Sequence, residues 1–170
     1  MSRCARLIQI IPTIFKMQNS PTTRIACLND VTTLLEFEQF LIAAERPHAL
    51  TLNQGPIHYY DLKYFIEDDN THLLLVEMDD IAIGCGYVQI RDSDAHHNST
   101  QHAYMGFMYV QPEWRGQGIN KMIMQQLQSW SMARDVRHFR LDVFMTNLAA
   151  VRAYEKSGFQ ANMIEMVMQL

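Results

Sequence analysis

The hydrophobic residues of this chain alternate between short continuous runs and stripes spaced three or four residues apart. Short runs bounded by turn-forming residues predict β-strands, and stripes with a period near 3.6 residues predict helices with one buried face. Runs of the first kind cover residues 22–28, 72–78, 81–90, 103–110 and 159–170, the last with room for one or two strands. Stripes of the second kind cover residues 30–45, 59–68, 119–133 and 147–157.

Turn-forming residues indicate how these elements connect. Asp79 and Asp80 separate two apolar runs and predict a two-residue hairpin turn. Gly84 and Gly86, in the second of these runs, indicate a bulge or the close approach of a ligand. Strands and helices in this order predict one α/β domain with a mixed, mainly antiparallel sheet.

The first 20 residues stand apart from this pattern. An apolar stretch at 7–15 follows two arginines, but polar residues and Pro12 interrupt it, and it is too short to span a bilayer. We therefore expect an N-terminal extension over residues 1–20 and the folded domain over residues 21–170. Met17 is an alternative starting residue, because a flexible leader would follow it.

The segment Val110–Asn120 joins the strand predicted at 103–110 to the helix predicted at 119–133. Gly116 and Gly118 have no Cβ atom, so a ligand can approach their backbone closely. The first N–H groups of a helix have no partner within it and lie at the positive end of its dipole. Arg115 adds a permanent positive charge. Together these features predict a binding site for an anion such as a pyrophosphate.

Two other glycine-loop motifs do not fit this segment. Gly118 is followed by Ile119, Asn120 and Lys121, which match neither the Walker loop nor the dinucleotide motif G-x-G-x-x-G. A structural turn before a helix is the alternative that the loop alone leaves open.

The sequence Val-Gln-Pro-Glu-Trp-Arg-Gly-Gln-Gly-Ile at 110–119 resembles the acetyl-CoA loop of the GNAT superfamily of N-acetyltransferases, R/Q-x-x-G-x-G/A. Arg115 and Gly118 match its first two positions, whereas Asn120 departs from the usual Gly or Ala at the third. Residues 141–144 and 147–159 are similar to the family's next strand and the helix after it. The close resemblance covers residues 104–159.

The resemblance implies a GNAT-like domain, with a twisted sheet flanked by about four helices, that moves an acetyl group from acetyl-CoA to a primary amine. It implies that these residues hold the cofactor: Tyr109, Val110, Arg115, Gly116, Gln117, Gly118, Ile119, Asn120, Asn147 and Tyr154. The amides of residues 115–120 would bind the pyrophosphate, and Asn147 would contact the pantetheine arm. A backbone N–H of Tyr109 or Val110 would polarise the thioester carbonyl. Tyr154 would be the general acid for the leaving sulfur, because phenol and thiol have similar pKa values. The reaction requires no metal.

The general base is not evident from the sequence. Many relatives carry a glutamate on the strand before the loop, but residues 102–109 contain no carboxylate. His102 or Tyr104 could act there, or else Glu45 or Asp61 on the predicted early helices. Several acidic residues on those helices, Glu38 among them, would attract a cationic amine. We expect the acceptor to be a small cationic amine or a peptide N-terminus, because a weak base handles a low-pKa amine more easily.

Composition and charge narrow the range of partners, cellular settings and metal sites that the protein could have. A net charge of −4 argues against nucleic acid as a partner, and no stretch is long and apolar enough to span a membrane. Three scattered cysteines indicate a reducing, cytoplasmic setting and no disulfide framework. His96 and His97, with Asp92 and Asp94 nearby, could suggest a metal site, but a solvated loop without metal is the preferred interpretation. A homodimer is compatible with the sequence.

A protein of another class would keep part of this pattern. A non-catalytic acyl-CoA-binding module would need Arg115, Gly116 and Gly118 but not Tyr154. The presence of both Asn147 and Tyr154 favours the enzyme.

Overall fold

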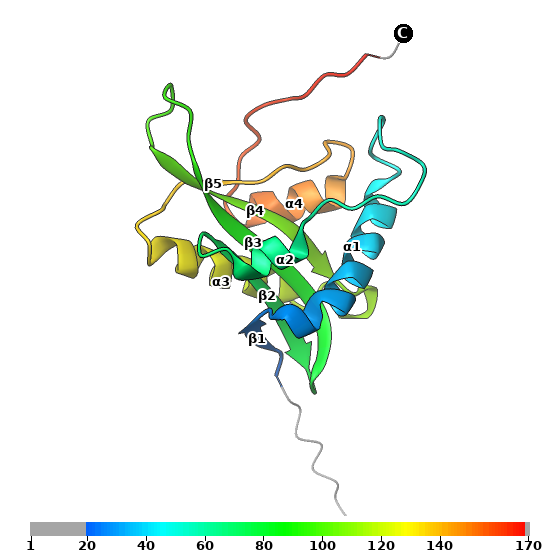
Figure 1. Ribbon diagram of the computed structural model, residues 1–170. Coiled ribbons are helices and arrows are strands. Elements are labelled where there is room, and N and C mark those ends of the chain that lie inside the picture. The colour runs from blue at the N-terminus through cyan, green and yellow to red at the C-terminus, as the bar shows by residue number, and fades with distance from the viewer. Residues whose placement is uncertain (1–19, 169–170) are drawn as a thin grey trace, which may run out of the picture.

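Five strands form one sheet, in the order of the sequence, in the computed structural model of the protein, which describes residues 20–168 (Figure 1). The strands are β1 (Thr22–Ile25), β2 (Thr71–Met78), β3 (Ile81–Asp92), β4 (Gln101–Val110) and β5 (Phe139–Arg140). The helices are α1 (Val31–Glu45), α2 (Leu62–Glu67), α3 (Ile119–Met132) and α4 (Leu148–Lys156), with 3-10 turns at Leu28–Asp30 and Pro112–Trp114. Neighbouring strands are antiparallel except β4 and β5, which are parallel. The predicted α/β class with a mainly antiparallel sheet and four helices is confirmed.

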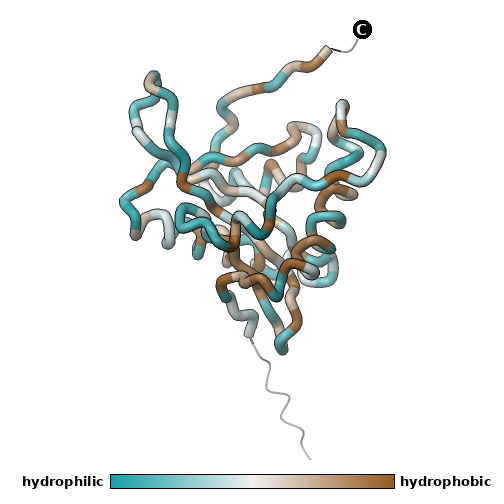
Figure 2. Tube along the Cα trace, in the orientation of Figure 1, coloured by the Kyte–Doolittle hydropathy of each residue, from teal (hydrophilic) through white to brown (hydrophobic). Residues whose placement is uncertain are grey.

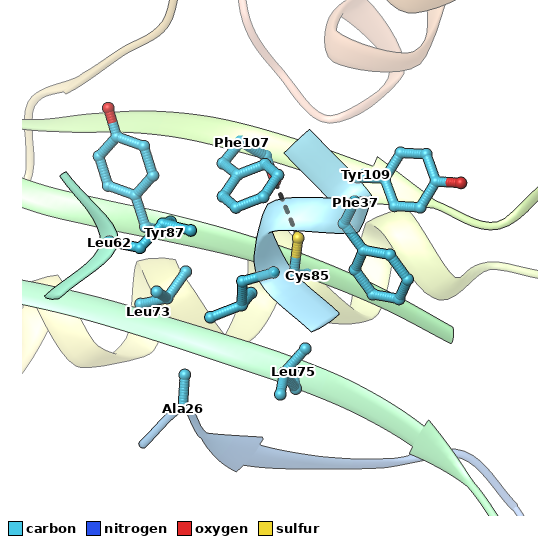
Figure 3. Close-up of a cluster of buried hydrophobic side chains, with 10 residues drawn as sticks. Ala26, Phe37, Leu62, Leu73, Leu75, Cys85, Tyr87, Phe107 and Tyr109 are labelled. Carbon is cyan, nitrogen blue, oxygen red and sulfur yellow. Dashed lines mark hydrogen bonds between the residues drawn. The ribbon is translucent and has the colours of Figure 1, made fainter. Parts of the chain in front are cut away.

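The sheet has a separate apolar core on each face. Helices α1 and α2 cover one face and pack on Leu73, Leu75, Phe107 and Tyr109 (Figure 3). Helix α3 covers the other face and packs on the side chains that alternate with these along β2 to β4. Figure 2 shows the apolar character of the sheet and the polar character of the connecting loops. Each helix buries its apolar stripe against the sheet, which accounts for the 3.6-residue period of hydrophobic positions in the sequence.

The strand β4 contains a bulge at Phe107 that reverses which side chains face each helix layer. Phe107 has a φ of 52°, and the pairing with β3 shifts between Cys85 and Tyr87. The residue before the bulge must be small, because a Cβ on Gly106 would lie 2.7 Å from the ring of Tyr87. The bulge predicted near Gly84 and Gly86 is confirmed by the pairing of β2 with β3, which shifts between Val76, opposite Gly84, and Glu77, opposite Ala82. Protein atoms fill the space beside both of those glycines, so the alternative of a ligand approaching them is wrong.

Strands β4 and β5 separate soon after they meet. Only Ala103 and Tyr104 of β4 pair with β5, opposite Phe139 and Arg140. The prediction of a strand at 141–144 is wrong. The strand lies two residues earlier, at Phe139–Arg140, because the chain has already left β4 by residue 141. A strand is held by its partner's N–H and C=O groups, so residues beyond the point of divergence have none to pair with. Within residues 20–168, the second half of β4 thus has one edge without a neighbouring strand.

The C-terminal segment does not form the strands that its apolar pattern predicted. Residues 159–168 have no strand pairing and run away from the sheet (Figure 1). Side chains along it are highly exposed, with Met163 at 88% and Met166 at 91%. An alternating pattern gives a strand only where a free sheet edge receives it, and the segment reaches none in this chain.

Other expectations agree with the structure to within a few residues. Asp30 stands at the start of α1, but its side chain bonds Arg24 and the N–H of Cys27 instead of capping the helix. The helix expected at 59–68 is shorter, Leu62–Glu67. Among the described residues, no helix is long and apolar enough to cross a membrane. The predicted extension over residues 1–20 lies almost wholly outside the described residues.

The hairpin between β2 and β3 gives a stability prediction. Asp79 and Asp80 have φ angles of 51° and 63°, which confirms the predicted two-residue turn with both residues left-handed. Because glycine takes this conformation without steric cost, Asp80→Gly should stabilise the fold by about 0.5–1 kcal/mol. The expected rise in melting temperature is roughly 1–4 °C. Asp80→Ala, which keeps the Cβ atom, should lower it, and a rise in both variants would contradict the assignment.

Candidate active site

The loop after β4 has the geometry of an anion cradle. After Val110 the chain makes a 3-10 turn at Pro112–Trp114 and then enters α3 through Gly116 and Gly118, with φ angles of 75° and 85°. No protein atom lies within 4 Å of a Cβ placed on either glycine. Gly118 is the N-cap of α3 and offers no side chain to bond the first N–H groups of the helix. The space that a ligand would need is therefore open and faces unpaired helix donors.

The side chains of the loop fix its shape. Arg115 Nε donates to the carbonyl of Val110 at 3.0 Å, and Gln117 Nε2 donates to the carbonyl of Glu113 at 2.9 Å. Asn120, which departs from the family pattern, lies inside α3 with its Nδ2 3.6 Å from Met124 Sδ. Its backbone is helical, so a glycine is not needed at this position. The loop geometry is thus compatible with the substitution.

The free edge of β4 leads from this cradle toward the bulge. The N–H of Gln111 donates to Ile83 on β3 at 2.9 Å. Because N–H directions alternate along a strand, the N–H of Tyr109 also points to β3 and that of Val110 points away from it. Val110 is therefore the better placed of the two predicted donors, since its N–H lies on the edge that β5 leaves open.

Two helices that are distant in sequence bring Glu45 and Tyr154 close to each other. Glu45 is the last residue of α1, and its charge acts on Tyr154 of α4. His48 Nδ1 and Thr146 Oγ1, 3.0 Å apart, connect the segments next to these helices. Phe37 and Phe40 of α1 pack on Tyr109, with ring centroids 4.9 and 6.2 Å away, which places this helix over the end of β4.

Burial changes the acid–base properties of both groups. Burial raises the pKa of Tyr154 to about 12, and the charge of Glu45 acts in the same direction. Burial also raises the pKa of Glu45, against the effect of hydrogen bonding from the Tyr59 hydroxyl. Tyr154 is therefore a protonated phenol near neutral pH, and Glu45 is a stronger base than an exposed carboxylate.

The remaining predicted residues have other neighbours. Asp61 is the N-cap of α2 and accepts a hydrogen bond from the N–H of Tyr64 at 3.1 Å. The hydroxyl of Tyr104 donates to Asp142 at 2.8 Å, and burial raises the pKa of this phenol, which argues against its use as a base. His102 lies near the far end of β4, with its Nδ1 2.9 Å from Ser93 Oγ.

Asn147 occupies the N-cap of α4. Its Oδ1 accepts a hydrogen bond from the N–H of Ala150 at 3.2 Å. Gly158 follows the helix with a φ of 94°, a left-handed conformation that is typical of a glycine at the C-terminal end of a helix. The cap uses only the oxygen of Asn147, so the Nδ2 donor has no partner among residues 20–168 and can serve a ligand.

The structure also adds residues that sequence reasoning missed. Glu38 is fully buried and bonds the backbone N–H groups of Tyr59 and Tyr60, so it adds nothing to the expected negative field at the surface. The sequence contains one indication that Glu38 is buried, namely its position on the buried stripe of α1, next to Phe37. In the β3–β4 loop, possible ligand atoms of Asp94, His96 and His97 lie within 4.8 Å of one another, whereas Asp92 is not part of this group.

Comparisons with known proteins agree with this site. The model of the acetyltransferase (GNAT) family matches residues 35–159. The chain is 27% identical over 78 residues to an aminoglycoside N(6′)-acetyltransferase type 1 of Stenotrophomonas maltophilia, a match that covers 44% of this chain and about half, 51%, of that relative.

Solved structures share the fold at low sequence identity. The BH1408 protein of Bacillus halodurans, as a tetramutant, superposes with a TM-score of 0.75 at 18% identity over 88% of this chain and 99% of its own. A predicted acetyltransferase of Clostridium acetobutylicum, solved with acetyl-CoA, gives 0.66 at 16% identity over 88% and 96%. Because the family model spans the helix of Glu45, the open loop and the helix of Tyr154, the chain belongs to the acetyltransferase (GNAT) family.

Proposed function

We propose that the protein is an N-acetyltransferase that uses acetyl-CoA as co-substrate and acetylates a primary amine of a small molecule. One observation carries the proposal: α1 and α4 place Glu45 beside Tyr154, at the end of β4 that opens into the glycine cradle. A non-catalytic binding module would have no use for a carboxylate whose charge acts on a buried phenol at that point.

The residues of the loop account for binding of the co-substrate. The N–H groups of residues 116–120 and the charge of Arg115 suit a pyrophosphate. The open edge of β4 and the Nδ2 donor of Asn147 suit the amides of a pantetheine arm. When bound, acetyl-CoA supplies an activated acyl group as a thioester.

The side chains then divide the work of the transfer. Glu45 takes a proton from the amine nitrogen as that nitrogen bonds to the carbonyl carbon. The N–H of Val110 holds the oxygen on which negative charge develops. The carbon–sulfur bond breaks as the carbonyl re-forms, and Tyr154 donates its hydroxyl proton to the departing sulfur. The products are an amide and a free thiol, and Tyr154 regains its proton from solvent or from Glu45.

The acceptor is proposed to be a small cationic amine of the aminoglycoside class. A relative that bears this activity in its name matches 78 residues of the chain. Glu45 supplies a negative charge at the reacting centre, which attracts an ammonium group; this group loses its first proton to solvent before the attack in which Glu45 takes the second. Screening aminoglycosides, polyamines and peptides for thiol release and for acetylated product by mass spectrometry tests this proposal. Acetyl-CoA binding without turnover on any acceptor would favour the non-catalytic module.

Substitution of Glu45 distinguishes the two carboxylates proposed from sequence. The base must be ionised, and burial raises the pKa of Glu45, so kcat/KM should fall with decreasing pH through a value above that of an ordinary glutamate. Glu45→Gln should remove this acidic limb and lower kcat/KM by about 10²–10⁴. Asp61→Asn keeps the shape of the helix cap and should leave kcat/KM unchanged. If Asp61→Asn removes the acidic limb of the pH profile and Glu45→Gln does not, Asp61 is the general base and Glu45 is not.

A further inference from the structure

Glu38 is a buried carboxylate with an unusually complete set of partners. Its side chain is fully buried on α1, in a layer that is otherwise apolar and aromatic. Oε1 accepts hydrogen bonds from the N–H of Tyr59 at 2.7 Å and the N–H of Tyr60 at 3.0 Å. Oε2 lies 2.6 Å from Nδ1 of His58, whose ring is largely exposed. One side chain therefore holds three consecutive residues of the α1–α2 connection.

Burial of a carboxylate is energetically unfavourable unless its oxygens accept hydrogen bonds. A carboxylate loses its hydration on burial, and only strong, well-aligned donors offset that loss. Hydrogen bonds from backbone N–H groups to a charged oxygen are among the stronger ones in proteins. The carboxylate thus fixes the path of residues 58–60 against α1 more firmly than apolar packing would.

The two tyrosines that Glu38 holds reach opposite sides of the candidate active site. The hydroxyl of Tyr59 lies near the carboxylate of Glu45, and each group affects the pKa of the other; Glu45 follows Glu38 by two helical turns on the same side of α1. The hydroxyl of Tyr60 accepts a hydrogen bond from the N–H of Phe107 at 3.2 Å, and its ring stacks on Phe107 at 4.8 Å. Phe107 is the bulge residue of β4. The segment 58–60 therefore connects the proposed base to the strand that carries the proposed oxyanion donor.

We propose that Glu38 is a positioning residue, which sets Tyr59 against Glu45 and Tyr60 against the β4 bulge and thereby orients the proposed base toward the acceptor amine. This inference rests on the proposed function, because it assigns Glu38 a role in acceptor turnover. The residue does not touch either substrate. Its effect passes through Tyr59.

A double-mutant cycle tests this path. Glu38→Gln keeps the size of the side chain but removes the charge that strengthens three hydrogen bonds. We expect it to lower kcat/KM for the best acceptor by roughly tenfold, a size found for residues that share one network. In a Tyr59→Phe background the same change should lower kcat/KM by less than about twofold, because the connection to Glu45 is already broken. Glu36→Gln, the same change on the exposed side of α1, should have no effect.

Two further measurements separate positioning from general stability. The dissociation constant of acetyl-CoA should be unchanged in Glu38→Gln, since Glu38 bonds residues 58–60 and no residue of the 111–118 loop. Hydrogen exchange of the Tyr59 and Tyr60 amides should accelerate in Glu38→Gln and not in Glu36→Gln. If Glu38→Gln does not fold, Glu38→Asp, which withdraws the carboxylate, carries the same expectations.

Failure of the positioning role of Glu38 can be distinguished from failure of the proposed function. Equal losses of kcat/KM in both backgrounds, in proportion to a loss of melting temperature, would overturn the inference and leave Glu38 a structural residue. Unchanged exchange of the two amides would also overturn it. If the parent protein binds acetyl-CoA but transfers no acetyl group, the proposed function fails, and the positioning role fails with it.

Discussion

Gly118→Asp is expected to abolish binding of acetyl-CoA. Gly118 has a φ of 85°, caps α3 and has no protein atom within 4 Å of a Cβ placed on it, so a side chain there enters the ligand space. A carboxylate at that point would face the phosphates and cancel the positive field of the helix N-terminus. We expect the dissociation constant to rise at least about 10²-fold, which corresponds to roughly 3 kcal/mol. Thermal stabilisation by acetyl-CoA and calorimetric titration both measure it.

Gly118→Asn is the matched control for this experiment. Asparagine has nearly the shape of aspartate and tolerates a left-handed backbone, but it carries no charge. Its binding should be weakened much less than that of Gly118→Asp. Equal loss in the two variants would assign the effect to steric obstruction or backbone strain. Acetyl-CoA bound normally by both would refute the cradle altogether.

Tyr154→Phe is expected to lower kcat by about 10²–10⁴ while leaving the affinity for acetyl-CoA within a few-fold of the parent. Tyr154 lies on α4, and its ring remains in the variant, so packing on Phe159 is retained. Only the hydroxyl that we propose as the proton donor is lost. Single-turnover kinetics measure the transfer step directly.

Tyr64→Phe provides the control for Tyr154→Phe. Tyr64 lies on α2 with 53% of its surface exposed, and it should tolerate loss of its hydroxyl without change in kcat. If Tyr154→Phe behaves like Tyr64→Phe, the phenol has only a structural role. A loss of acetyl-CoA affinity equal to the loss in kcat would instead make Tyr154 a binding residue.

The raised pKa of Tyr154 refines its proposed role. With a pKa of about 12, the phenol is a weaker acid than a free thiol, whose pKa is near 8.5, by roughly 5 kcal/mol. Complete transfer of its proton is therefore unfavourable unless another group replaces it at once. In the proposed mechanism Glu45 has just taken a proton from the amine and would be the group that supplies it, directly or through solvent. The phenol then donates a hydrogen bond to the sulfur early and a proton only late, and no basic limb from Tyr154 is expected below about pH 11.

Local patterns were sufficient for the elements and for the cofactor loop. The spacing of Leu34 and Phe37 predicted α1, and the pair Asp79–Asp80 predicted the hairpin turn, because these signals depend on neighbours in sequence. Arg115 and Gly118 predicted the loop for the same reason: a helix N-terminus and a glycine turn form an anion site without help from distant residues. The C-terminal strands were the exception, because pairing requires an edge that the sequence does not display.

The base and its surroundings depended on tertiary structure. The sequence named Glu45, Asp61, Tyr104 and His102 with equal justification, since each is an ionisable residue near a predicted element. Folding makes Asp61 a helix cap, gives Tyr104 to Asp142, and places Glu45 beside Tyr154. The separation in sequence differs among these contacts, from three positions for Asp61 and Tyr64 and 38 for Tyr104 and Asp142 to more than a hundred for Glu45 and Tyr154, and burial, not residue type, shifts the pKa values.

By itself, then, the sequence determined the α/β elements, the glycine cradle and the family resemblance, all of which rest on residues within a few positions of one another. Only the tertiary structure decided that β4 bulges at Phe107, that β5 leaves β4 after Tyr104, and that Glu38 is buried. The physical reason is that a bulge, a free strand edge and a desolvated carboxylate arise from packing between whole layers. Those long-range contacts create the space and the acid–base environment in which the loop and the two helices meet.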